Sequence, residues 1–186
     1  IRGPRFLKLP IPSADQPMTP VSLSEILEIE EGEVIHEGQA GIMGEGAEPL
    51  RRIEGRCSTC TLLVVQDTQT KKTYYGHSLY EDTGNLNQTL DTAVKEFYGF
   101  GERVVVYVAG GTPFHAYHDR NKLMATARRA GFRVVGAVSH LGGPNMFGVT
   151  TVFDPGESVF YVVEDIYPVG AARMAAVLVE GAGSAG

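Results

Sequence analysis

Residues 59–79 read TCTLLVVQDTQTKKTYYGHSL, and this stretch decides the fold. Residues 59–66 are rich in β-branched and apolar side chains, which is typical of a buried strand. Residues 67–72 are polar and predict a turn, and residues 73–79 predict the return strand. The stretch therefore predicts a β-hairpin whose two strands are joined by a polar turn.

A helix is expected directly after the hairpin, over residues 85–97. Its apolar side chains recur at helical spacing, at Leu86, Leu90, Ala93, Val94 and Phe97. We expect Asn85 or Asn87 to cap the start of this helix, and Gly99 and Gly101 to mark its end.

The chain continues to alternate between strands and helices. Four expected strands and one helical pattern follow the first helix. Strands are expected over residues 103–109, 132–139, 148–153 and 158–163, and a second helix over residues 119–130. The alternation predicts an α/β (α+β) fold. Because a hairpin lies at each end, we expect a layered sandwich of mixed β-sheet with flanking helices.

The two ends of the chain are expected to be irregular. Prolines punctuate the start, a short helix is expected over residues 22–31, and four glycines predict a loop over residues 37–49. A flexible tail is expected from Gly181. The predicted division is an irregular N-terminal extension over residues 1–50, a central domain over residues 51–170 and a C-terminal segment with a flexible tail over residues 171–186.

Composition argues against two classes of function. The net charge is -6 and the Lys and Arg residues are scattered, whereas nucleic-acid binders normally show a clustered basic face. No apolar run approaches the ~20 residues that a membrane-spanning helix needs. We therefore expect no nucleic-acid binding and no membrane insertion.

The chain has two cysteines, Cys57 and Cys60. Two cysteines do not make a secreted disulfide framework in a chain of this length, so we expect a cytoplasmic, reducing environment. In that environment a cysteine is catalytic, metal-binding or simply buried.

Cys60 is the candidate nucleophile and His77 the candidate base. A free thiol has a pKa of ~8.5, so a nucleophilic cysteine needs a nearby group that takes its proton. Hairpin geometry brings the beginning of one strand close to the end of the next, which places Cys60 near His77.

The same region resembles a known family. Residues 58–60 (STC) open the apolar strand, Asp67 closes it, and residues 75–77 (YGH) follow. This arrangement resembles the chemoreceptor glutamine deamidase family CheD and, more distantly, the cytotoxic necrotizing factor toxins, which share its Cys–His site. Further segments resemble CheD in the same order, at residues 104–111, 118–121, 134–145 and 149–155.

The resemblance implies a CheD-like protein-glutamine deamidase, a hydrolase with a catalytic cysteine that acts in chemotaxis. Cys60 would be the nucleophile and His77 its base, while Ser58 or Thr59 would supply an assisting hydroxyl or the oxyanion loop. The family needs no metal or organic cofactor. Its partners are a protein that carries the target glutamine and a CheC-like regulator. One departure is Glu54, which stands where the family has an assisting threonine.

Besides a different target for the same cysteine hydrolase chemistry, as in toxins of this type that act on host GTPases, two alternatives remain open at this point. A zinc site could use Cys57, Cys60 and His77, but a strand that begins near residue 58 would direct the two cysteines to opposite faces. The other histidine pair, His115 and His118, lies in a polar turn. The second alternative is a catalytically inactive CheD-like module that binds or regulates a partner.

Overall fold

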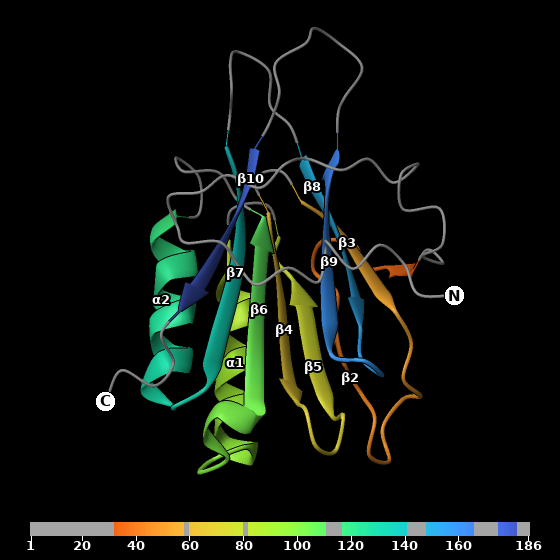
Figure 1. Cartoon of the computed structure of the whole chain (residues 1–186), viewed down its shortest axis with the longest axis vertical. Helices are drawn as coiled ribbons and strands as arrows, with labels where there is room; N and C mark the ends of the chain where they lie inside the picture. The colour runs from red at the N-terminus through yellow and green to blue at the C-terminus, as the bar shows by residue number, and fades with distance from the viewer. Residues whose placement is uncertain are drawn as a thin grey trace, which may run out of the picture.

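Two β-sheets form the framework of the computed structural model of this chain (Figure 1). The structure describes residues 32–57, 60–79, 82–110, 117–140, 148–165 and 175–181. The expected helix over residues 22–31 lies outside these ranges. None of the described helices is long and apolar enough to cross a bilayer.

The larger sheet has six strands and is mixed. Its spatial order is β10-β7-β6-β4-β5-β2, and β6 and β7 form its parallel pair. The bounds are β2 (Ala40–Met43), β4 (Thr61–Asp67), β5 (Thr73–His77), β6 (Val104–Gly110), β7 (Arg133–His140) and β10 (Ala175–Gly181). The hairpin predicted from residues 59–79 is confirmed, since β4 and β5 pair antiparallel with Leu62 opposite His77.

The smaller sheet has four strands in the order β1-β3-β8-β9. The bounds are β1 (Glu33–Val34), β3 (Ile53–Cys57), β8 (Gly148–Asp154) and β9 (Val159–Asp165). The hairpin expected near the C-terminal end is confirmed as β8 and β9, which pair antiparallel. β3 lies between β1 and β8: β1 pairs with Ile53 and Glu54, and the last residue of β3, Cys57, pairs with Val149 of β8.

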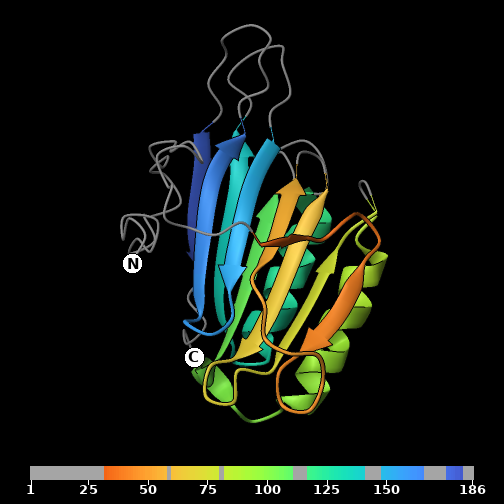
Figure 2. The same cartoon turned by 90° about the vertical axis from the view of Figure 1, so that its right-hand side faces the viewer.

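Two helices cover one face of the six-stranded sheet, and the four-stranded sheet covers the other (Figure 2). The helices are α1 (Gly84–Glu96) and α2 (Tyr117–Arg129), and a 3-10 turn (Gly101–Arg103) precedes β6. The expected layered sandwich of mixed sheet with flanking helices is confirmed.

The side chains of β4 point alternately toward the helices and toward the smaller sheet, which explains why the sheet containing β4 lies between two other layers. Leu63 and Val65 point toward the helices and join a core that includes Leu90 and Phe132. Leu62 points the other way, where a side chain at Gly55 of β3 would touch it. Burial on both faces is why this strand reads as a continuous apolar run.

Two expectations of irregular structure were wrong. The loop expected over residues 37–49 contains β2, which adds to the edge of β5 and so satisfies its backbone despite the nearby glycines. The irregular extension also contains β1, and the C-terminal segment contains β10, whose last residue is Gly181. These strands form because a neighbouring sheet edge supplies their hydrogen-bond partners.

The start of α1 also differs from the expectation. Its N-cap is Thr83, without a side-chain capping bond, rather than Asn85 or Asn87. Asn85 instead donates its side-chain N–H to the His77 carbonyl at 2.8 Å. Asn85 therefore ties the helix to the end of β5, where the candidate site begins.

Replacing Asp67 by Asn should lower the free energy of unfolding by about 1–2 kcal/mol at neutral pH. The Arg103 guanidinium donates to both Asp67 carboxylate oxygens, at 2.6 and 2.7 Å. Hydrogen bonding to Arg103 lowers the pKa of Asp67 from 3.8 to about 2. Because Arg103 is one-third exposed, solvent screening keeps the effect below the full value of the shift.

The pH dependence provides the check on this ion pair. The pKa of Asp67 is lower in the folded state, so its stabilisation is complete above about pH 4 and is lost as the pH falls toward 2. Urea unfolding of the wild type and of Asp67→Asn should therefore differ at neutral pH and converge in acid. An equal difference at both pH values would contradict this role.

Candidate active site

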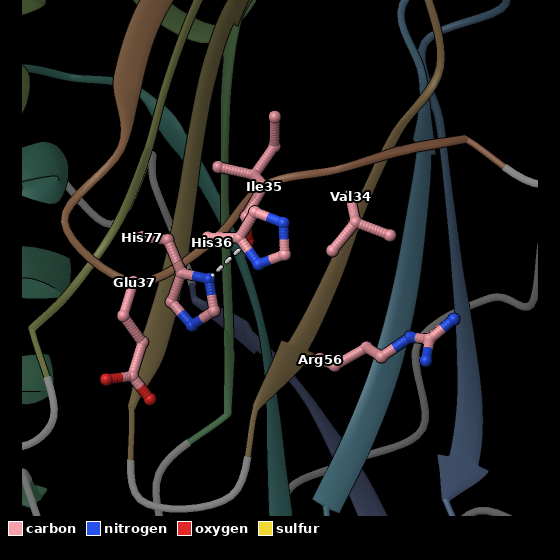
Figure 3. Close-up of a pocket in the computed structure, with 6 residues that line it drawn as sticks. All are labelled: Val34, Ile35, His36, Glu37, Arg56 and His77. Atoms are coloured by element: carbon pink, nitrogen blue, oxygen red, sulfur yellow. Dashed lines mark hydrogen bonds between the residues drawn. The ribbon is translucent and has the colours of Figure 1, made fainter.

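His77 ends β5 and faces the layer between the two sheets. It lies opposite Leu62, and it is 3% exposed. Its Nδ1 atom lies 2.6 Å from the Ile35 carbonyl oxygen (Figure 3). Because a carbonyl oxygen can only accept, Nδ1 carries the hydrogen and Nε2 is left to accept a proton or to bind a ligand.

The Ile35 carbonyl is itself fixed by the smaller sheet. The Ile35 N–H donates to the Glu54 carbonyl at 2.8 Å, immediately after β1. The segment around Ile35 therefore connects β3 in one sheet to His77 in the other. This connection holds the imidazole in one orientation, as the third member of a catalytic triad does.

Cys60 lies immediately before β4 and points at the same imidazole. Its Sγ atom is 2.9 Å from His77 Nε2 and 3.7 Å from the Arg56 carbonyl oxygen. The structure thus brings together the two residues that the hairpin places near each other. A thiol and an imidazole at this distance can share a proton.

Cys57 is the residue whose position sequence reasoning missed. Its Sγ atom lies 3.6 Å from His77 Nε2. The expectation that Cys57 and Cys60 point to opposite faces was wrong, because they do not share a strand: β3 ends at Cys57 and β4 begins at Thr61 in the other sheet. The Cys-x-x-Cys spacing had already suggested Cys57 as a zinc ligand, and the structure places Cys57 beside His77 as that alternative requires.

The surroundings of the cluster shift the pKa of Cys57 and the pKa of His77. Hydrogen bonding to Cys60 and burial raise the pKa of Cys57 well above its ordinary value. Burial lowers the pKa of His77, but the hydrogen bonds to Cys60 and Ile35 outweigh burial and leave it raised. The arrangement therefore favours a protonated Cys57 and a His77 that can hold the proton of Cys60.

Gly110 allows the two cysteines to approach each other. It ends β6 with φ +90, and a Cβ there would lie 2.3 Å from Cys57 Cβ and 2.4 Å from the Cys60 carbonyl oxygen. Buried Arg120 of α2 donates to the Gly110 carbonyl at 2.9 Å and fixes this strand end. Only glycine satisfies both the backbone conformation and the space.

Among the residues that the structure describes, no other sequence-predicted site residue joins this cluster. Ser58 and Thr59 lie outside the described residues, as does His115. The Glu54 carboxylate pairs with Arg56 Nε at 2.6 Å, on the face of β3 opposite Cys57. Glu54 therefore does not take the place of the family's assisting threonine beside the sulfur.

A cavity of about 500 Å³ opens beside His77 (Figure 3). Its described lining is Val34, Ile35, His36, Glu37, Arg56 and His77. Cys60 is only 2% exposed and is not among these residues. Among the described residues, the cavity therefore reaches His77 but not the sulfur of Cys60.

Comparison with known proteins gives no family for this chain. No protein-family model matches its sequence, and no curated protein matches it either.

Proposed function

We propose that this chain is a cysteine-dependent amidohydrolase that converts glutamine side chains of a partner protein to glutamate. The observation that carries the proposal is the 2.9 Å contact between Cys60 Sγ and His77 Nε2. A nucleophile, a base and a group that orients the base are all present, since Nδ1 of His77 donates to the Ile35 carbonyl.

The reaction follows from these three groups. His77 takes the proton of Cys60, and the thiolate attacks the amide carbon of the substrate. Protonated His77 then gives its proton to the departing ammonia, which leaves a thioester on Cys60. His77 next activates a water molecule, which hydrolyses the thioester, releases glutamate and regenerates the thiol.

Burial of the sulfur favours a side-chain amide over a peptide bond as the substrate. Cys60 and His77 are 2% and 3% exposed. A peptide bond could reach them only if a groove opened for a whole backbone segment. The amide of glutamine lies at the end of an unbranched side chain, and such a side chain can enter a narrow opening beside His77.

The resemblance to CheD extends the proposal to partners and setting. It supports a chemoreceptor-type protein as the substrate, a CheC-like protein as the regulator and the cytoplasm as the compartment. Both cysteines are free thiols, which suits a reducing compartment. The inactive binding module is the alternative, and it predicts no turnover of any glutamine.

The experiment measures two products of one reaction. Reduced, metal-free protein is incubated with glutamine-rich cytoplasmic segments of chemoreceptors, and ammonia release is followed together with the substrate mass. We expect equal amounts of ammonia and of glutamine-to-glutamate conversion at particular sites. A matched substrate with asparagine at those sites should release far less ammonia. The absence of both products across the panel would contradict the proposal.

A further inference from the structure

The mechanism above leaves one buried thiol unused. Cys57 is 1% exposed and lies 3.6 Å from His77 Nε2, yet a cysteine hydrolase needs only one sulfur at its base. The ligand atoms of Cys57, Cys60 and His77 all lie within 4.8 Å of one another. From this convergence we propose that the three side chains form a binding site for a thiophilic divalent cation, of which zinc is the best fit.

The distances fit a tetrahedral ion. Zinc binds sulfur at about 2.3 Å and imidazole nitrogen at about 2.0–2.1 Å, so a sulfur and a nitrogen on one tetrahedral ion lie about 3.6 Å apart. Cys57 Sγ and His77 Nε2 already have this separation. Cys60 Sγ lies at 2.9 Å and has to move away from Nε2 by about 0.7 Å to reach the same tetrahedral separation.

The surroundings also suit a metal ligand set. Nδ1 of His77 donates to the Ile35 carbonyl, which is the outer contact that metal-binding histidines make and which directs Nε2 to the ion. Glu37 lines the cavity beside His77, so a carboxylate that favours a cation lies near the site. Three protein ligands leave a fourth position for water, with the cavity beside His77 as its entrance.

Metal binding and hydrolysis use the same atoms. A cation held by Cys60 Sγ and His77 Nε2 occupies the electron pair of the nucleophile and that of the base. The ion therefore switches the hydrolase off, and this consequence rests on the proposed function. The binding itself does not, because it depends only on the three ligands.

Cobalt titration of the reduced full chain tests the site. Cobalt(II) reports its own ligands, through a sulfur-to-metal charge-transfer band and strong visible bands when it is tetrahedral. We expect one cobalt per chain with both signals, and displacement by one equivalent of zinc. Weak octahedral bands without charge transfer would overturn the proposal. The titration uses the wild-type chain alone, so its result stands even if the variants described next do not fold.

Two variants locate the site. Cys57→Ser should weaken cobalt and zinc binding by more than roughly 100-fold, since loss of a ligand costs at least as much as loss of an outer contact. His36→Ala removes an exposed imidazole from the cavity lining and should bind as the wild type does. Equal weakening in both variants would place the ion elsewhere and overturn the proposal.

Activity separates this inference from the proposed function. Zinc should inhibit the wild-type hydrolase and leave Cys57→Ser largely active at the same concentration. Zinc binding to wild type without any hydrolysis by metal-free protein would remove the proposed function and leave the metal site standing. Hydrolysis by metal-free protein that binds no zinc would remove the metal site and leave the proposed function standing.

Discussion

Cys60→Ala should reduce glutamine hydrolysis by more than about 10³-fold, whereas Cys57→Ala should keep the rate within about tenfold of wild type. Cys60 has the shorter contact to His77 Nε2, 2.9 Å against 3.6 Å for Cys57. Burial and hydrogen bonding to Cys60 also hold the pKa of Cys57 high, so Cys57 stays protonated. The measurement is the initial rate of ammonia release from reduced, metal-free protein.

His77 and His36 supply the matched pair for this prediction. His77→Ala should lose as much activity as Cys60→Ala, because the nucleophile and its base act as a unit. His36→Ala should retain activity, since His36 lines the cavity but makes no contact with either sulfur in the described hydrogen bonds. Equal losses for Cys57→Ala and Cys60→Ala would assign the pair to a structural or metal role instead.

Gly110→Ala should be the most destabilising small substitution near the site, with a loss of about 2–5 kcal/mol in the free energy of unfolding. An alanine at φ +90 is strained, and its Cβ would overlap Cys57 Cβ and the Cys60 carbonyl oxygen. The first of these atoms adjoins the backbone and the second belongs to it, so neither can move aside cheaply. Denaturant unfolding with an unchanged m-value measures the loss.

Gly46→Ala isolates the steric part of that loss. Gly46 has φ +85, close to that of Gly110, but no atom lies within 4 Å of the Cβ position. We expect this variant to lose only about 1–2 kcal/mol, from backbone strain alone. Gly110→Ala should also lose hydrolysis and cobalt binding, because it separates the two sulfurs. Similar losses of stability in the two variants would mean that crowding at Gly110 is relieved without cost.

The hairpin was predictable because its two strands and the turn between them are neighbours in the sequence. Residues 59–79 contain two buried strands and the turn between them, and its pairing brings Cys60 to His77 without any distant partner. β3 was not predicted, because its inward side chains are Ile53, Gly55 and Cys57 and offer little apolar alternation. β2 was missed because it forms only against the edge of β5.

The rest of the site depends on contacts between segments that are far apart in the sequence. The Ile35 carbonyl that orients His77 is a backbone atom, and 42 residues separate the two. No pattern of side chains in the sequence indicates that a backbone carbonyl will take this position. The position of Cys57 depends on the end of β3 in one sheet and the start of β4 in the other, whereas the sequence suggested a single strand.

Glutamine-directed labelling tests the central claim most directly, because it shows which sulfur attacks. A glutamine analogue with a chloromethyl ketone in place of the side-chain amide is incubated with reduced protein, and the labelled peptide is identified by mass spectrometry. We predict one label per chain, on Cys60, present in Cys57→Ala and absent in His77→Ala. Labelling of Cys57 in preference to Cys60, or Cys60 labelling that does not depend on His77, would contradict the account.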